Sequence, residues 1–167
     1  MRPFHHRVVK DRYLADLMLI RLARWLRMAG QDVSNPPEGS DDSDLMEIAL
    51  KEGKILLTRD RVLARRCEKA KTACLLIRSS DLDEQLSELK EAGLSLELNP
   101  ERCTLCNGLL LEVTDSDLID EPGRSPEGSN SWRCERCGKI YWRGTHWRGM
   151  IERLEGGNGD HLLRRRP

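Results

Sequence analysis

The sequence is poor in the features that mark several large classes of protein. Aromatic residues make up only 4% of its 167 residues, and 28 basic residues balance 28 acidic ones. It has no run of the roughly 20 apolar residues that a membrane helix needs, and no stretch that resembles a cleavable secretory signal. With 38% hydrophobic residues and no net charge, its composition is not that of a disordered chain. We therefore expect a folded, cytoplasmic protein of one or two small domains that contacts no membrane.

Four of the six cysteines form two C-x-x-C pairs, Cys103 with Cys106 and Cys134 with Cys137. Each pair can direct two sulfur atoms at one ion, so the two pairs together supply the closed four-cysteine shell of a structural zinc site. Disulfides or a redox-active pair are weaker interpretations, because no secretory signal is present and two pairs occur rather than one. The spacing therefore predicts a zinc ion that stabilises the fold rather than one that catalyses a reaction.

Short apolar segments alternate with amphipathic helices in the first part of the chain. Strands that are apolar throughout are typical of a parallel sheet covered by helices on both faces. The pattern predicts strands near 13–15, 31–34, 54–58 and 73–77, and helices near 17–29, 61–70, 82–92 and from an N-cap at Ser40 to Gly53. We expect an α/β sandwich over 11–98, a zinc ribbon over 99–150, and flexible extensions over 1–10 and 151–167.

Acidic residues follow the strands of this predicted sheet. Asp16 ends the first strand, Asp60 follows the third, and Asp41, Asp42 and Asp44 open the second helix. Parallel strands deliver their carboxyl ends to one edge, where ligands collect, so we expect these carboxylates to converge. Carboxylates close together repel one another, and Mg²⁺ or Mn²⁺, which prefers oxygen ligands, relieves that repulsion.

Such an arrangement can hydrolyse a phosphodiester, because one ion activates a water molecule and a second stabilises the leaving oxygen. We predict Asp16, Asp42 and Asp60 as the ligands of Mg²⁺ or Mn²⁺, with Asp44 as an auxiliary residue and Thr58 as a positioning hydroxyl. An alternative remains open, because acidic residues at the start of a helix also stabilise it electrostatically without any ion.

Several segments, in matching order, resemble one known family. They are D-x-M-L-x-R-L-A-R-W-L-R-M-x-G at 16–30, L-L-T-R-D at 56–60, the two C-x-x-C pairs, and Y-W-R-G-T-H-W at 141–147. Over about residues 11–150 they are similar to the Mut-seven carboxy-terminal ribonuclease family, a PIN-like nuclease domain followed by a zinc ribbon. The resemblance implies a small Rossmann-like, PIN-type three-layer sandwich that binds Mg²⁺ or Mn²⁺ and cleaves RNA. Ile20 departs from the pattern, since the family usually has glycine there.

Basic residues in several places are candidates for contact with nucleic acid, because guanidinium groups match phosphate oxygens and aromatic rings stack on bases. The candidates are Arg21, Arg24 and Arg27 on the first predicted helix, Arg59 beside the third strand, and Arg143 and His146 on the ribbon. An exposed helix face, or ion pairs with the acidic second helix, explains the helical arginines equally well. Trp142 is interpreted as core, because a small zinc module needs aromatic residues for packing.

The sequence thus predicts a metal-dependent endoribonuclease with structural zinc and catalytic Mg²⁺ or Mn²⁺. One alternative is a catalytically silent RNA- or ribosome-binding adaptor that uses only the basic surfaces. A phosphoacceptor domain fits less well, because no adjacent acids end the first strand and no lysine lies on the predicted strand at 73–77. An inhibitory or ribosomal protein partner is compatible with either function, and no motif indicates the oligomeric state or a choice between RNA and DNA.

Overall fold

The computed structural model of the protein describes residues 10–114, 117 and 130–155. Its first part contains a parallel sheet of four strands, whose spatial order is β2-β1-β3-β4. The strands are β1 (Arg12–Ala15), β2 (Asp32–Ser34), β3 (Ile55–Thr58) and β4 (Cys74–Leu76). Because all four run in the same direction, their carboxyl ends lie at one edge of the sheet.

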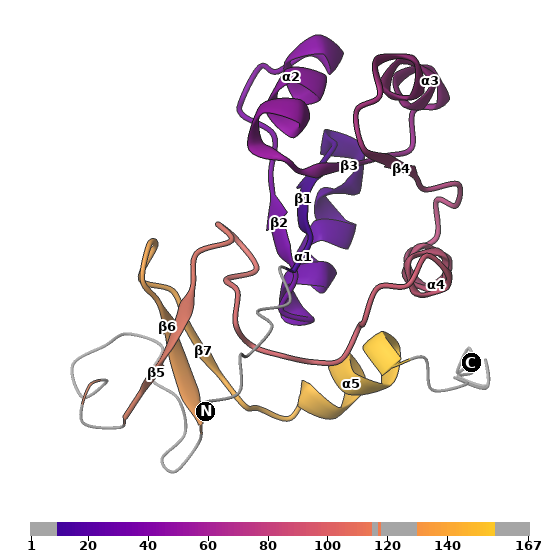
Figure 1. The fold of residues 1–167 in the computed structure, drawn as a ribbon. Helices are drawn as coiled ribbons and strands as arrows, with labels where there is room; N and C mark the ends of the chain where they lie inside the picture. Colours follow the sequence, from indigo (N-terminus) through magenta and orange to yellow (C-terminus); the bar gives the residue numbers. More distant parts are fainter. Residues whose placement is uncertain (1–9, 115–116, 118–129, 156–167) are drawn as a thin grey trace, which may run out of the picture.

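Helices cover both faces of this sheet (Figure 1). One face carries α1 (Ile20–Met28), which follows the short 3-10 helix η1 (Leu17–Leu19), together with α4 (Leu82–Glu91). The other face carries α2 (Asp42–Glu52) and α3 (Arg61–Ala70). Leu56 and Leu57 enter the two opposite apolar clusters, since successive strand residues point to opposite faces. This arrangement confirms the predicted three-layer α/β fold class.

The predicted N-cap of α2 is wrong by one residue. Asp41, rather than Ser40, caps the helix, because its carboxylate accepts hydrogen bonds from the backbone N–H groups two and three residues later. The carboxylate of Asp44 in turn accepts a hydrogen bond from the Asp41 backbone N–H at 2.9 Å. This reciprocal pair is a capping box, which satisfies otherwise unpaired donors of the first turn.

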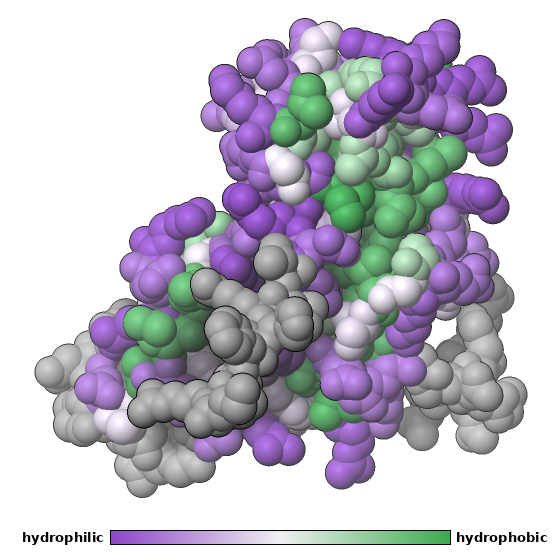
Figure 2. Space-filling view, viewed as in Figure 1, coloured by the Kyte–Doolittle hydropathy of each residue, from purple (hydrophilic) through white to green (hydrophobic). Residues whose placement is uncertain are grey.

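One edge of the parallel sheet remains open in the described part of the chain. The edge strand β4 pairs with β3 alone, and its three residues are partly exposed. Figure 2 shows hydrophobic residues gathered between α3 and α4, whereas hydrophilic residues cover the outer sides of α2 and α3. Short edge strands limit unwanted pairing with other sheets, which is consistent with the length of β4.

The second part is an antiparallel sheet that carries the two C-x-x-C pairs. Its strands β5 (Leu110–Val113), β6 (Ser131–Cys134) and β7 (Ile140–Trp142) lie in the order β5-β6-β7. The register pairs Leu110 with Cys134, so the end of β6 lies beside the start of β5. We refer to this sheet and its cysteine turns, residues 101–146, as the ribbon.

The ribbon continues into a last helix, α5 (Trp147–Glu155), which Figure 1 shows running toward α4. Leu154 is fully buried and belongs to the same apolar cluster as α1 and α4. Arg153 pairs with Asp83 of α4 at 2.7 Å and lies 5.2 Å above the ring of Trp25. Residues 151–155, which were predicted to be part of a flexible extension, are therefore helical and packed. The rest of that extension, 156–167, lies outside the described residues, as do residues 1–9 of the other predicted extension. Within the described ranges, no helix has the length and apolar character needed to cross a bilayer.

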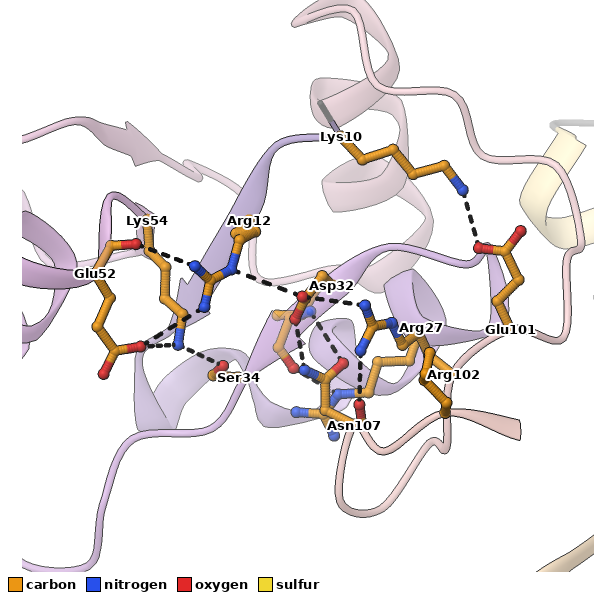
Figure 3. A network of polar contacts seen from close by, with 12 residues as sticks. Lys10, Arg12, Arg27, Asp32, Ser34, Glu52, Lys54, Glu101, Arg102 and Asn107 are labelled. Carbon is orange, nitrogen blue, oxygen red and sulfur yellow. Dashed lines mark hydrogen bonds and ion pairs between the residues drawn. The ribbon is translucent and has the colours of Figure 1, made fainter. Parts of the chain in front are cut away.

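Polar contacts join the ribbon to the amino-terminal edge of the parallel sheet (Figure 3). Asp32 of β2 accepts a hydrogen bond from Nδ2 of Asn107 at 2.7 Å and pairs with Arg102 at 3.2 Å. The side-chain oxygen of Asn107 accepts a hydrogen bond from the Val33 backbone N–H at 3.2 Å. Because Asn107 directly follows Cys106, these contacts tie the first cysteine pair to β2.

Arg27 of α1 extends this junction into the protein interior (Figure 3). Its side chain is 1% exposed, and its Nε donates to the Val33 carbonyl oxygen at 2.7 Å. Its Nη1 donates to the carbonyl oxygens of Thr104 and Leu105, at 2.9 and 3.2 Å, between the first two cysteines. Burial lowers the pKa of the Arg27 guanidinium from its ordinary value, yet the group keeps its charge at neutral pH. One side chain therefore links α1, β2 and the first cysteine turn.

Candidate functional site

The four cysteines of the two C-x-x-C pairs come together at one end of the ribbon. Their sulfur atoms all lie within 4.8 Å of one another. Gly108 leaves room for this cluster, because a Cβ there would lie 2.9 Å from the Cys134 sulfur. Four thiolates in a compact group are the donor set of tetrahedral zinc sites, so Cys103, Cys106, Cys134 and Cys137 could hold a zinc ion.

Hydrogen bonds prepare one of these thiols for metal binding. Burial alone would raise the pKa of Cys103, but the Tyr141 hydroxyl, 3.2 Å from its sulfur, and backbone N–H groups of Cys106 and Leu105 lower the pKa to about 6. Burial raises the pKa of Cys106 to about 12. Since only thiolates bind zinc, an ion has to displace the Cys106 proton, which makes binding stronger as the pH rises.

At the carboxyl edge of the parallel sheet, Thr58 connects two of the predicted acidic residues. Its buried hydroxyl donates to Oδ2 of Asp16 at 2.7 Å and accepts from the backbone N–H of Asp60 at 3.0 Å. Asp60 uses its Oδ1 to cap α3. Within the described segments, no hydrogen bond engages Asp16 Oδ1 or Asp60 Oδ2. Each carboxylate at this edge therefore keeps one oxygen atom for a further partner.

The predicted acidic residues of α2 are engaged elsewhere. The carboxylate of Asp42 pairs with Nη1 of Arg66 on α3 at 3.1 Å, and Nη2 of Arg66 donates to the Ser43 hydroxyl at 2.8 Å. The carboxylate of Asp44 belongs to the capping box of α2. Among the described residues, the acidic side chains do not form a cluster of three that could share an ion, whereas the cysteines do. The structure thus joins Asp16 to Asp60 through Thr58, whereas the carboxylates of Asp42 and Asp44 have partners on α2 and α3.

Arg59, beside this edge, contains a buried donor without an acceptor. Among the residues that the structure describes, its Nε is the one buried side-chain nitrogen or oxygen atom without a hydrogen-bond partner. An unpaired buried donor costs about 1–3 kcal/mol, and sites that await a ligand are one recognised setting for it. Three apolar side chains next to the acidic residues are also exposed, by 60–63%: Leu17, Met18 and Val62.

The predicted contacts with nucleic acid divide into exposed and buried side chains. Arg21 and Arg24 on α1, and Arg143 and His146 on the ribbon, are exposed, so a phosphate can reach them. Arg27 is 1% exposed and donates to backbone carbonyls. It therefore does not belong to the predicted arginine ridge, because the ribbon covers that turn of α1.

The structure differs from the sequence interpretation in two features of the ribbon and the helix that follows it. Trp142, expected in the core, is 41% exposed, whereas Trp132 is 8% exposed. The helix α5 was not predicted, although its apolar residues recur at positions i, i+3, i+4 and i+7, a spacing typical of an amphipathic helix. These residues are Trp147, Met150, Ile151 and Leu154.

Comparison with known proteins assigns the chain to a family. The Mut7-C RNAse domain matches residues 11–154, a range that begins just before β1 and ends within α5. No curated protein and no solved structure matches the chain. The match includes both the parallel sheet and the ribbon, and it covers well over half of the sequence. The chain therefore belongs to the Mut7-C RNase domain family.

Proposed function

We propose that this protein is an endoribonuclease that hydrolyses RNA phosphodiester bonds with Mg²⁺ or Mn²⁺ held by Asp16, Asp42 and Asp60. The observation that carries the proposal is the Thr58 hydroxyl, which joins Asp16 to the Asp60 backbone at the edge where parallel sheets bind ligands. Membership of an RNase domain family supports the reaction class. A divalent ion bound there supplies the Lewis acid that activates water for attack on phosphorus.

The contacts of the three carboxylates support this assignment unequally. Asp16 and Asp60 each keep one oxygen atom for an ion, as described above. Asp42 pairs with Arg66, but both side chains of this pair are more than 40% exposed. An exposed ion pair contributes only about 0–1 kcal/mol, so a divalent ion can replace Arg66 as the partner of Asp42 at little cost. Asp44 remains an auxiliary residue at the start of α2.

Basic side chains around the edge are the proposed contacts of the RNA backbone. Arg59 directly precedes Asp60 in the sequence, and its side chain is only partly buried, so its guanidinium can pair with a phosphate oxygen. Arg21 and Arg24 are exposed on the helix that follows Asp16. These contacts position the RNA and carry no information about its base sequence.

We further propose that the ion of the cysteine cluster is zinc and that its role is structural. Four thiolate ligands complete a tetrahedral shell, so no position remains for water or substrate. In this proposal, hydrolysis takes place at the carboxyl edge of the parallel sheet, and the zinc ion holds the ribbon folded.

A cleavage assay tests the proposed activity. Labelled RNA and DNA of one sequence are incubated with the protein and added Mn²⁺, and the products are separated by electrophoresis. RNA is the expected substrate, and Asp16→Asn is expected to slow its cleavage at least about 100-fold, since even outer-shell partners of a metal cost 10–100-fold when removed. Asparagine keeps an oxygen acceptor for the Thr58 hydroxyl, so the hydrogen bond at the edge is preserved.

Asp83→Asn is the matched control, because it makes the same chemical change on α4, where Asp83 forms a surface pair with Arg153. This variant is expected to cleave RNA at the wild-type rate. The assay varies added Mn²⁺ and uses no chelator, because a chelator would also remove the ion of the cysteine cluster. Equal cleavage by the wild type and Asp16→Asn would contradict the proposal.

A silent RNA- or ribosome-binding adaptor is the second candidate function. The observation in its favour is the pairing of Asp42 with Arg66, which neutralises one of the three carboxylates without an ion. The same assay separates the two functions. Wild-type protein that binds RNA tightly but leaves it intact in Mn²⁺ is an adaptor, and no substitution of Asp16 should then alter that binding.

A further inference from the structure

A small apolar cavity lies where the ribbon, the end of α1 and α5 meet. Its volume is about 80 Å³, and its wall includes Trp132, Tyr141, Trp142, Trp147, Met28 and Met150. Three of the four tryptophans of the protein therefore border one cavity. Of the described residues that line it, none is acidic.

The aromatic residues of this wall have different surroundings. Trp132 and Trp147 stack on each other with ring centroids 5.7 Å apart and an angle of 10° between the planes. Because Trp132 is 8% exposed, this pair forms the packed inner wall and fastens α5 to the ribbon. Trp142 is 41% exposed and presents an indole surface to solvent at the cavity.

Two exposed cations lie against the same aromatic group. The guanidinium of Arg143 lies 5.7 Å from the ring centroid of Trp147, and the Lys139 ammonium lies 5.5 Å from that of Tyr141. Arg102 also lines the cavity, but its guanidinium pairs with Asp32. An apolar, aromatic cavity with no acid in its wall and two exposed cations beside it is complementary to a flat base carried on a chain of phosphates.

We propose that one base of single-stranded RNA stacks on the exposed side of Trp142 at the mouth of this cavity, while Arg143 contacts a neighbouring phosphate. The inference rests on the proposed function for the identity of the ligand as RNA, but it does not require cleavage. Stacking accepts any base, since every base has a π face, so the site adds affinity for unpaired RNA rather than sequence preference.

The position of the cavity indicates the length of RNA that would use it. Asp16 precedes η1 and α1, whereas Met28, in the cavity wall, ends α1. At about 1.5 Å per helical residue, the two sites are separated by on the order of 15–20 Å along this segment. An RNA of several nucleotides is needed to reach both sites, so dinucleotides should be insensitive to changes at Trp142.

RNA binding by the zinc-loaded protein, measured without added Mg²⁺ or Mn²⁺, tests the proposal. The probe is a fluorescein-labelled oligouridylate of twelve nucleotides, titrated at low salt and followed by fluorescence anisotropy. Trp142→Ala is expected to weaken binding roughly 5- to 150-fold, the range for loss of one stacked base, and Trp142→Phe is expected to restore most of the affinity. Leu111→Ala, at another exposed apolar residue of the ribbon, is the matched control and should bind like the wild type.

A second probe separates stacking from electrostatic or folding effects. A twelve-nucleotide chain of the same charge but without bases should bind the wild type and Trp142→Ala equally. Arg143→Gln should weaken binding to both probes and reduce the slope of log affinity against log salt by about 1. Unchanged binding of the oligouridylate by Trp142→Ala, or an equal loss on both probes, would overturn the proposal and leave the cavity as an ordinary part of the ribbon core or a contact for a protein.

The two proposals fail in different ways. If the wild type does not cleave RNA in Mn²⁺ but loses affinity on Trp142→Ala, the nuclease proposal is wrong and the base site stands. If the wild type cleaves RNA and Trp142→Ala binds like the wild type, the base site is wrong and the nuclease proposal stands.

Discussion

Removal of the ion from the cysteine cluster is expected to unfold the ribbon and release α5 from the α/β core. In small zinc modules, metal binding supplies about 10–16 kcal/mol of apparent folding free energy, which is as large as the whole stability of a typical domain, about 5–15 kcal/mol. The three short strands of the ribbon bury few residues besides Ser131, Trp132 and Cys134, so packing alone does not compensate.

Tryptophan fluorescence measures this transition directly, because Trp132, Trp142 and Trp147 report on the ribbon and α5, and Trp25 reports on α1. A chelator should shift the emission to longer wavelength, and added Zn²⁺ should reverse the shift. The purified protein should contain one zinc ion per chain, Cys134→Ser should lack it, and Cys67→Ala, which changes a buried cysteine of α3, should retain it. Unchanged fluorescence after complete removal of zinc would contradict a structural role for the ion.

Replacement of Arg27 by methionine is expected to destabilise the protein by about 3–5 kcal/mol, the cost of breaking a buried, charged hydrogen-bond network. Methionine fills much of the same volume but donates no hydrogen bonds, so the carbonyl oxygens of Val33, Thr104 and Leu105 lose a donor in the interior. Arg27→Lys keeps the charge but lacks the forked donor geometry, so its stability should lie between those of the wild type and Arg27→Met.

Denaturant titrations check this prediction, with circular dichroism as the signal. Arg24→Met is the matched control, because Arg24 is exposed on the same helix and its replacement should change the stability by no more than about 0.5 kcal/mol. Arg27→Met should also bind zinc more weakly, since Arg27 donates to the backbone between Cys103 and Cys106. Similar stabilities for the Arg27 and Arg24 variants would show that the junction does not depend on this network.

Much of the fold can be predicted from the sequence, because its signals are local. Residues 55–58 are apolar up to a terminal threonine and are followed by the helix-capping Asp60, and the structure contains β3 and α3 at these positions. The cysteine spacing likewise predicts the cluster, since a C-x-x-C turn places its two sulfur atoms without reference to the rest of the chain. The amphipathic pattern of α5 was equally local, but the glycine-rich sequence after it favoured the interpretation of a frayed end.

The candidate catalytic edge was predictable only in part. Asp16 follows β1, Thr58 ends the neighbouring parallel strand β3, and Asp60 comes two residues later, so strand direction alone brings them to one edge. The partner of Asp42 could not be predicted, because Arg66 lies on a different helix and either an ion or an arginine satisfies a carboxylate at that position. The prediction that all three carboxylates hold Mg²⁺ or Mn²⁺ stays a proposal for the cleavage assay to test.

The sequence by itself determined the helices and strands of the α/β part, its parallel sheet and the four-cysteine donor set, since each depends on periodicity or spacing within a short segment. Only the tertiary structure decided which polar and aromatic side chains are accessible. Arg21, Arg24 and Arg27 recur at helical spacing, yet only Arg27 is buried, because the cysteine turn that covers it lies 77 residues later in the chain. Trp132 is buried and Trp142 is exposed for the same reason, because contacts between distant segments, rather than the identity of the residue, decide which surface water can reach.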